Sequence, residues 1–252
     1  MKILAIETTG KYGSAAVIDE EGRIWSAESR EEMNHLRGII SLIDEALGSA
    51  GITKNDLTHI AASIGPGSFT GIRIGVTTAR TMAQMLGVPC IAVSSIEALA
   101  EGSLSAAISA NALYVVPIIN ARRHQTYGAI YEAEFTSDYE HQALNLISEE
   151  KQYMIEELLV KLGGNESYFT GDGIDAYKDI IESALPEGTY KFAGEDMRYQ
   201  SAESVAVIAL KKAKIGDTLT YDKLMPEYMR LAEAEQRLRA GTLSDRIKNP
   251  KV

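Results

Sequence analysis

The sequence predicts an α/β protein, because short strand-like apolar runs alternate with longer segments of helical periodicity. Three short runs, at residues 3–6, 13–19 and 23–29, open the chain with turns between them and predict an antiparallel meander. A helix, a strand, a second helix and a further strand come next, so the expected order is βββαβαβ. In the second half a strand, a polar turn and a glycine-containing strand recur, with Gly128 in the place of Gly13. This recurrence indicates a degenerate internal duplication.

The composition is that of an ordinary globular protein, long enough for one large domain or two smaller ones. The chain has 252 residues, of which 45% are hydrophobic, and 35 acidic against 25 basic residues give a net charge of -10. This acidity argues against a chain that grips a nucleic-acid backbone on its own. Cys90 is the single cysteine, so a disulfide framework is excluded and a buried structural thiol is expected. The sequence has no apolar run of about 18 residues and no leader pattern, so we expect no membrane contact and a cytoplasmic location.

Two amphipathic helices in the first half predict a surface for a partner. The first covers residues 36–47 behind Asn34 as N-cap, and the second covers residues 72–86. Beside its apolar stripe the second helix has a flank of small residues, against which another backbone could pack closely. The alternative, in which both faces are covered within the monomer, stays open. The predicted partner surface comprises Leu36, Ile39, Leu42, Ile43, Gly71, Arg73, Gly75, Thr78, Ala79 and Met82.

A glycine loop at residues 65–71 joins a strand at residues 59–64 to the second helix. Glycines on both sides of a proline predict a sharp turn, and Ser68 or Thr70 could cap the helix. Free amides at a helix start can also bind an anion. The loop therefore predicts either a phosphate or partner contact or only a tight strand-to-helix turn. It is not a P-loop, because no Gly-Lys-Ser/Thr sequence follows.

The second half continues the α/β pattern with a hairpin of two strands, at residues 113–120 and 125–135, around a turn at 121–124. A Gly-Asp-Gly sequence at 171–173 predicts another strand-to-helix turn. Ser148, followed by two glutamates, is expected to cap a helix. The expected helices span residues 94–110, 148–162, 176–184 and 202–213, with a charged helical stretch at 226–240 and a loop at 137–145.

Several of these segments together carry a resemblance. The opening ILAIETT, the loop GPGSFTGIRIG, the hairpin NARRHQTYGAIY, the GDG turn and the late PEYMR resemble the TsaB (YeaZ) family over residues 1–235. The resemblance implies an actin/hexokinase/Hsp70-type fold, in which two lobes of mixed sheet and helices are related by duplication. The expected parts are an N-terminal lobe at residues 1–105, a C-terminal lobe at 106–215, a helical segment at 216–240 that packs back on the first lobe, and a tail at 241–252.

The resemblance also implies a function. Members of this family are non-catalytic subunits of a bacterial complex that transfers a threonylcarbamoyl group to the adenosine beside the anticodon, in tRNAs that read codons beginning with A. The implied partners are a TsaD-like catalytic subunit and a TsaE-like ATPase, with a homodimer when the chain is alone and tRNA bound only through the complex. No cofactor is expected in the isolated chain, and ATP or ADP is expected only in the assembled complex.

The residues at metal-binding positions support a non-catalytic role. The catalytic relatives hold iron or zinc with two histidines four residues apart on the first long helix. Here His35 is followed at that spacing by Ile39, so one ligand is missing and no metal site is expected. A catalytic nucleophile is also not expected, because Ser68 has no histidine near it in sequence and Cys90 has no activating charge.

Phosphate binding is weakened but stays open. Kinase-type members of the fold use Asp, Gly and Thr at the end of the first strand, where this chain has Glu7 and then two threonines, and the second-lobe counterpart is Asn120. Arg122 and Arg123 in the neighbouring turn could contact an anion or a partner, or could simply face water. The candidate phosphate residues are Glu7, Thr8, Thr9, Gly65, Gly67 and Ser68. The competing functions are a glycoprotease-like metallopeptidase and a nucleotide-binding small-molecule kinase.

Overall fold

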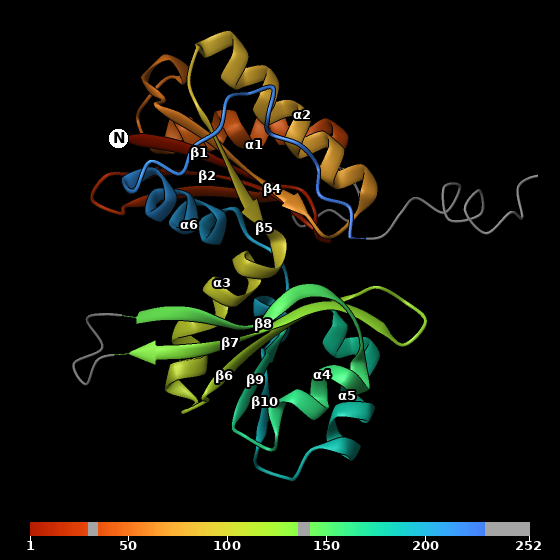
Figure 1. Ribbon diagram of the computed structural model, residues 1–252. Helices are drawn as coiled ribbons and strands as arrows, with labels where there is room; N and C mark the ends of the chain where they lie inside the picture. Colours follow the sequence, from red (N-terminus) through yellow and green to blue (C-terminus); the bar gives the residue numbers. More distant parts are fainter. Residues whose placement is uncertain (30–34, 136–141, 230–252) are drawn as a thin grey trace, which may run out of the picture.

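The computed structural model describes residues 1–29, 35–135 and 142–229. It has two lobes, one above the other in Figure 1, and each is built on a mixed sheet of five strands. The strand order is β3-β2-β1-β4-β5 in the first sheet and β10-β9-β6-β7-β8 in the second. The α/β class and the two mixed-sheet lobes expected from the sequence are confirmed.

The first sheet begins with the predicted antiparallel meander, and β4 and β5 then add to the other side of β1 in parallel. Successive residues of β1 face opposite sides, and both sides are buried. Leu4 belongs to the core under α1 and α2, whereas Ile3 belongs to the core under α6. The elements are β1 (Lys2–Glu7), β2 (Gly13–Asp19), β3 (Ile24–Ser29), α1 (His35–Ser49), β4 (His59–Gly65), α2 (Phe69–Leu86), β5 (Cys90–Ser94) and α6 (Ala202–Lys214).

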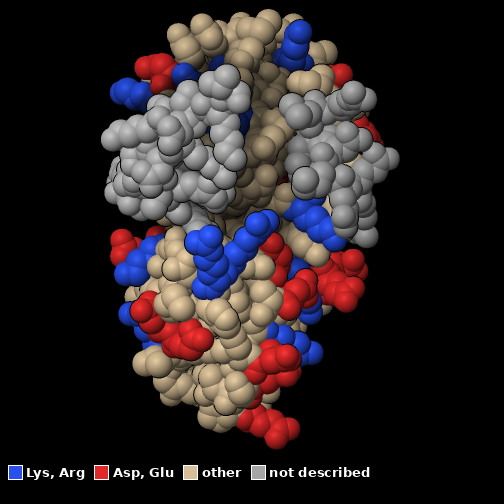
Figure 2. Space-filling view, turned by 90° about the vertical axis from the view of Figure 1, so that its right-hand side faces the viewer, with Lys and Arg blue, Asp and Glu red and all other residues tan. Residues whose placement is uncertain are grey.

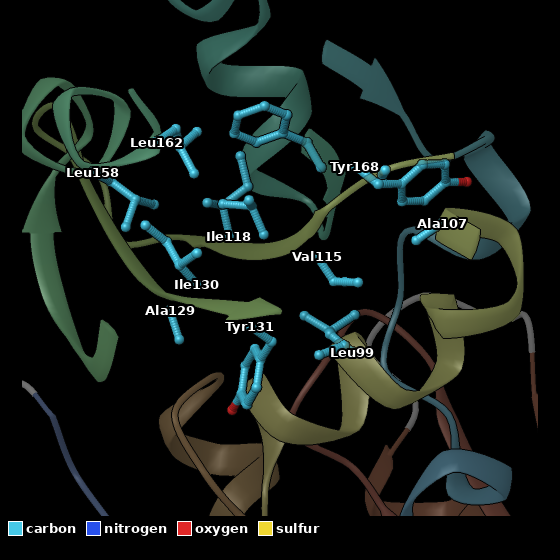
Figure 3. Packing of buried hydrophobic residues seen from close by; sticks show 14 of the residues in the cluster. Leu99, Ala107, Val115, Ile118, Ala129, Ile130, Tyr131, Leu158, Leu162 and Tyr168 are labelled. Atoms are coloured by element: carbon cyan, nitrogen blue, oxygen red, sulfur yellow. The ribbon is translucent and has the colours of Figure 1, made fainter. Parts of the chain in front are cut away.

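The second lobe places helices on both faces of its sheet, as Figure 3 shows. Leu99 of α3 lies on one side of the strands, and Leu158 of α4 lies with Ile118 on the other. A single buried cluster runs through these layers. The elements are α3 (Ser95–Ser109), β6 (Tyr114–Asn120), β7 (Gln125–Phe135), β8 (Gln142–Met154), α4 (Ile155–Leu162), β9 (Ser167–Thr170), α5 (Gly173–Ala184) and β10 (Tyr190–Phe192).

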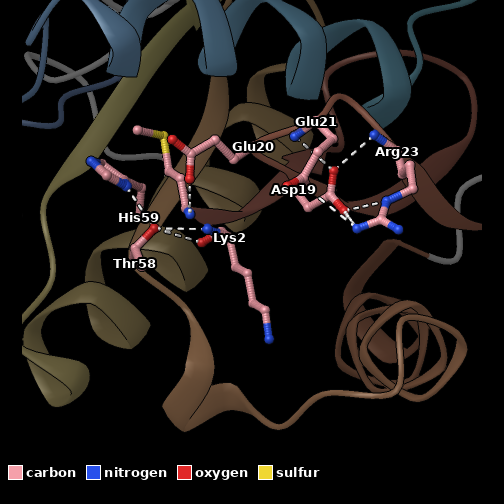
Figure 4. A network of polar contacts seen from close by, with 8 residues as sticks. Lys2, Asp19, Glu20, Glu21, Arg23, Thr58 and His59 are labelled. Carbon is pink, nitrogen blue, oxygen red and sulfur yellow. Dashed lines mark hydrogen bonds and ion pairs between the residues drawn. The ribbon is translucent and has the colours of Figure 1, made fainter.

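The β2–β3 turn of the first sheet is held by a network of polar contacts (Figure 4). Asp19 accepts hydrogen bonds from the backbone amides of Glu21 and Arg23, and the Arg23 Nε lies 2.6 Å from the same carboxyl group. At the other end of the turn the terminal amine of Met1 lies 3.0 Å from Glu20. These bonds fix the β2–β3 turn, in which Gly22 takes the positive φ expected of it.

One predicted helix is partly wrong, because residues 142–154 form β8 and the helix begins only at Ile155. Ser148, proposed as its cap, instead lies inside the strand. The pairing of β7 with β8 shifts register on both sides of Ile130, so β8 contains bulges. A bulge interrupts the alternation of apolar and polar residues that identifies a strand. The predicted loop at 137–145 is accordingly wrong from Gln142 onward, and residues 136–141 lie outside the described part.

The C-terminal part of the chain returns to the first lobe. The backbones of Leu219 and Cys90 exchange two hydrogen bonds of 2.7 and 2.8 Å, and Leu224 is fully buried in the first-lobe core. The amide of Glu227 donates to the carbonyl of Ile64 at 2.8 Å. Residues 226–229 are not helical, so the prediction of a helix from 226 fails there, and 230–240 lie outside the described residues.

The expected boundary between the lobes also needs correction. Residues 202–213 were placed in the second lobe, but α6 packs against β1 and β2 of the first sheet. Conversely α3, assigned mostly to the first lobe, contributes Leu99 and Leu104 to the core of the second. Both helices contact each other, so they form the junction between the lobes. None of the described helices is long and apolar enough to cross a membrane.

Candidate functional site

The residues at the end of β1 form a closed polar network. Glu7 has no exposed surface, and its carboxyl group accepts hydrogen bonds from the backbone amide of Thr9, from the Thr9 hydroxyl at 2.7 Å and from the Ser63 hydroxyl. Thr9 Oγ1 also lies 2.8 Å from Ser95 Oγ, at the start of α3. Burial raises the pKa of Glu7 above its ordinary value of 4.5, although the hydrogen bonds oppose this. Both carboxyl oxygens are therefore used by the chain itself.

The glycine loop is held between the end of β1 and the C-terminal segment. The amide of Ser68 donates to the carbonyl of Thr9 at 2.8 Å, and Ser68 Oγ accepts from the amide of Gly71 at 3.2 Å, which confirms Ser68 as the helix cap. A Cβ on Gly67 would lie 2.4 Å from the Thr9 carbonyl oxygen, and one on Gly65 would lie 2.4 Å from that of Glu227. The glycines are thus required by close backbone approach.

The small flank of α2 is filled by the chain itself. Gly71 accepts a 2.7 Å hydrogen bond from the Thr8 hydroxyl, and a Cβ on Gly71 would lie 1.9 Å from the Thr8 carbonyl oxygen. A Cβ on Gly75 would lie 2.4 Å from Thr8 Oγ1. The prediction that these glycines admit an external partner is therefore wrong for this structure, because the end of β1 occupies the space.

Half of the remaining predicted partner residues also face inward. Ile39, Leu42, Ile43 and Ala79 are buried in the first-lobe core. The exposed side chain of the predicted set is Arg73, with Thr78 and Met82 half-buried, and nothing is described of the side chain of Leu36. The alternative that both helix faces are largely covered within the monomer fits these residues better.

Other side chains on the first-lobe helices do point outward. Ile40 of α1 is 56% exposed and Met85 of α2 is 77% exposed. The guanidinium of Arg73 lies 3.9 Å from the ring centre of Phe69, and its Nε donates to Tyr228 at 2.9 Å. Ile40 belongs to the apolar periodicity of the sequence, and Met85 could have been found by plotting the outer face of the second helix. Tyr228 had no local signal, since it is distant in sequence.

The β6–β7 turn has an unusual backbone. Arg122, Arg123 and His124 have φ values of 63°, 55° and 61°, so three consecutive residues are left-handed. The side-chain oxygen of Asn120 accepts from the amide of Arg122 at 2.8 Å and from the hydroxyl of Tyr177 at 3.2 Å. Asn120 thus organises the turn.

The loop after β9 supports the same turn. The amide of Asn120 donates to the carboxyl group of Asp172 at 2.9 Å, and burial raises the pKa of that carboxyl group. A Cβ on Gly171 would lie 2.1 Å from the carbonyl oxygen of Ile118, and one on Gly173 would lie 2.8 Å from it. The Gly-Asp-Gly sequence therefore packs directly on β6, in the strand-to-helix turn predicted for it.

The described residues offer few candidates for a metal site or for a catalytic nucleophile. Within residues 1–29, 35–135 and 142–229, no three His, Cys, Asp or Glu side chains are grouped as metal ligands. Cys90 is buried, and burial raises the pKa of its thiol to about 11. A thiol of this kind stays protonated at neutral pH and is a poor nucleophile.

A cavity of about 790 Å³ lies between the lobes and was not anticipated from the sequence. Its walls come from β3, α3, α6 and the segment before α6, which are far apart in the chain. Lys11 Nζ lies 5.3 and 5.4 Å from the ring centres of Tyr12 and Tyr199, and Arg198 pairs with Asp175. Arg198 and Asp175 thus pair with each other within the lining, and Lys11 lies near two tyrosine rings of it.

Comparison with known proteins gives one consistent group. The model of the family described as TsaD, tRNA N6-adenosine threonylcarbamoyltransferase, matches residues 29–238. The tRNA threonylcarbamoyladenosine biosynthesis protein TsaB of Bacillus subtilis is 31% identical over 239 residues, covering 93% of this chain and 96% of the relative. TsaB of Escherichia coli is 27% identical over 230 residues, covering 91% and 95%. The expected resemblance is confirmed.

The solved structures and the related enzymes differ in the share of this chain that they match. YeaZ from Pseudomonas aeruginosa has a TM-score of 0.74 at 23% identity and covers 90% of this chain and 99% of its own, so the fold is shared. A tRNA N6-adenosine threonylcarbamoyltransferase of Chlorobium phaeobacteroides is 38% identical over 115 residues, but these are 39% of this chain and 32% of that enzyme. Among these relatives, the ones that match over most of both chains are therefore those named TsaB.

Proposed function

The chain belongs to the TsaB (YeaZ) family, which serves in the biosynthesis of threonylcarbamoyladenosine in tRNA, and from this premise we propose that it is a non-catalytic subunit of the modifying complex. Its role is to dock and activate a TsaD-like catalytic subunit, which transfers the threonylcarbamoyl group to the adenosine beside the anticodon of tRNAs reading codons that begin with A. The observation that carries the proposal is the match to TsaB over nearly the full length of both chains.

The polar groups of the first lobe support a role without catalysis. The position where kinase-like relatives hold metal and phosphate has Glu7, whose carboxyl oxygens are turned to Thr9 and Ser63. Cys90 is buried in the sheet with a raised pKa. We propose that the isolated chain holds no cofactor, and that ATP or ADP is bound only in the assembled complex.

The outward surface of α1 and α2 supports docking of the catalytic subunit. Ile40 and Met85 are exposed there, and an exposed apolar surface gains free energy when a partner covers it. Arg73, which lies over the ring of Phe69 and donates a hydrogen bond to Tyr228, adds a cation and two neighbouring rings to these helices. In isolation the same surface joins two copies into a homodimer. A TsaE-like ATPase completes the complex, tRNA is held through the complex, and the work takes place in the cytoplasm.

Reconstitution tests the proposal. The rate of threonylcarbamoyl transfer to tRNA is measured with TsaD-like and TsaE-like subunits, with and without this chain. We expect the rate of transfer to depend on this chain. An equal rate of transfer in its absence would contradict the proposal. Tight stoichiometric metal in the lone chain, or micromolar affinity for ATP, would favour a metallopeptidase or a kinase instead.

The docking surface is tested with matched charge insertions. The double variant I40E/M85E places two charges on the exposed apolar side chains of α1 and α2, and we expect it to lose both the homodimer and the complex in sedimentation. The control V160E changes a residue of α4 in the second lobe that is 82% exposed. It should assemble like the wild type, because it lies on the other lobe.

A further inference from the structure

The β6–β7 turn has an unfavourable backbone conformation at the three residues whose side chains it presents. Arg122, Arg123 and His124 all have left-handed φ values, a conformation that crowds the Cβ of any residue but glycine. Glycine at these positions would relieve the crowding. Positions of this kind persist where the surrounding structure enforces them, and they concentrate at functional sites.

The fold does enforce this turn. The carbonyl of Arg122 accepts from the amide of Gln125 at 3.0 Å, and the amide of Ala121 donates to the carbonyl of Gln125 at 2.9 Å. The carbonyl of His124 accepts from the amide of Ile155 at 3.1 Å, at the start of α4. With Asn120 holding the amide of Arg122, the turn is bound at both ends and its side chains are exposed.

The two turn arginines differ from the other arginines whose side chains the structure describes. The side chains of Arg122 and Arg123 have no hydrogen bond, ion pair or ring contact within the described part of the chain. The others each have a partner: Arg23 with Asp19, Arg73 with Tyr228, Arg80 with Met225 and Arg198 with Asp175. The turn thus presents two exposed guanidinium groups, on adjacent residues, that have no partner among the described residues, in a chain whose net charge is -10.

The position of the turn suits a contact that both lobes share. In Figure 1 it projects from the second lobe toward the right, and the end of β4 and the start of α2 lie on the same side of the first lobe. Figure 2 shows this side, where Lys and Arg side chains gather near the level at which the lobes meet, while Asp and Glu lie mainly lower on the second lobe.

From this geometry we infer that the turn of residues 122–124 contacts the phosphate backbone of RNA. Paired guanidinium forks match phosphate oxygens in a bidentate manner. Between residues 114 and 128 of the described chain no large apolar side chain is exposed, although Met154, which pairs with Gln125, is 38% exposed. The turn itself therefore offers charged rather than apolar groups to a partner. The inference rests on the proposed function, in which the catalytic subunit supplies the main grip on tRNA and this turn adds one or two phosphate contacts.

The test uses the complex of the full chain with its catalytic subunit and unmodified tRNA. The variant R122G/R123G removes both guanidinium groups and relieves the backbone, so it should unfold at a higher temperature than the wild type. We expect its complex to bind tRNA about tenfold more weakly. The slope of log affinity against log salt should also be flatter by about 1 to 2. The control K54Q/K161Q removes two exposed charges elsewhere and should keep the wild-type slope.

Three results would overturn the inference. Equal affinity and slope in R122G/R123G would show that no phosphate is contacted. Loss of the protein complex itself, seen by sedimentation, would assign the turn to a protein partner. Loss of ATP binding with unchanged tRNA binding would assign it to a free nucleotide. If the wild-type chain does not assemble with the catalytic subunit, the proposed function is wrong. The contact with RNA is then tested by measuring tRNA binding to the isolated wild-type and R122G/R123G chains at low salt, and equal binding by the two would contradict the inference.

Discussion

Glu7 shows how a residue suited to catalysis is used for structure. Its side chain ties the end of β1 to Ser63 of β4 and, through Thr9, to Ser95 at the start of α3. A buried carboxyl group is costly unless its oxygens have donors, and here both have them. The same arrangement that satisfies the group removes it from solvent and from any ligand.

The raised pKa of Glu7 predicts a pH dependence of stability. The folded state holds the proton to a higher pH than the unfolded state, whose pKa is near 4.5, so the free energy of unfolding falls as pH rises from about that value through the folded pKa. Each unit of difference is worth about 1.4 kcal/mol. The variant Glu7→Gln cannot ionise, so urea unfolding across pH 4 to 8 should show its stability gaining on the wild type as pH rises.

A second carboxyl group gives the opposite sign and serves as the control. Asp56 accepts two hydrogen bonds of 2.9 Å from Thr53, and these hold its pKa below the ordinary value of 3.8. Its contribution is present above that value and is lost as pH falls through the folded pKa. The free energy of unfolding of Asp56→Asn should therefore differ less from that of the wild type in acid than at neutral pH. A Glu7→Gln curve parallel to the wild type would contradict the raised pKa.

At the scale of elements, α2 shows what the sequence could and could not give. Its cap and its apolar stripe are local patterns: the stripe is predicted correctly, and of the two candidate caps, Ser68 and Thr70, the structure uses Ser68, so the helix begins at Phe69 rather than at Ile72. The use of Gly71 and Gly75 is not local, because the atom that they approach belongs to Thr8, more than sixty residues earlier. Small residues on a helix mark a close neighbour, but the sequence does not say whether that neighbour is another molecule or the same chain.

The prediction of a helix from Ser148 was wrong for a different reason, since residues 142–154 form β8. Ser148 followed by Glu149 and Glu150 is a good helix start by local rules, and only the pairing with β7 makes it a strand. The strand carries bulges, which hide its alternation. The left-handed turn at residues 122–124 was equally hidden, since arginine and histidine give no sign of a positive φ. The sequence indicates the loops after β1, β4 and β6 as candidates, but the contacts that their residues make depend on segments distant in the chain.

The contact between α2 and β1 gives a prediction with an internal control. Gly71→Ala should lower the free energy of unfolding by about 1 to 3 kcal/mol, because its Cβ would collide with backbone. Gly48→Ala in α1 meets nothing within 4 Å and should raise it by about 0.5 to 1 kcal/mol through helix propensity. Urea unfolding of both variants checks this. A stable Gly71→Ala protein that only fails to assemble would restore the partner face predicted from the sequence.

At the scale of the whole molecule, the bulges of β8 have a consequence for how the lobes are joined. Between the pairs Gly128–Lys151 and Ile130–Ser148 the register shifts, and Glu150 lies in this irregular stretch. Its carboxyl group accepts hydrogen bonds from Tyr131 of β7 and from Ser94, which ends β5 and caps α3. At the contact between the two helices, Lys211 of α6 pairs with Glu101 of α3 at 2.6 Å. A polar junction thus links the second sheet to the crossing between the lobes.

Removing Glu150 should loosen this junction. Burial and the nearby carboxylate raise the pKa of Tyr131, so its buried hydroxyl stays a donor and loses its acceptor in Glu150→Ala. We expect a loss of about 1 to 3 kcal/mol in the free energy of unfolding, and faster hydrogen exchange at the start of α3, where Ser94 is freed. Tyr131→Phe removes the donor, so the double variant should lose less than the sum of the two single losses. Additive losses would mean that Tyr131 and Glu150 do not interact. Unchanged hydrogen exchange at the start of α3 would mean that Glu150 does not couple the second sheet to Ser94 and the crossing between the lobes.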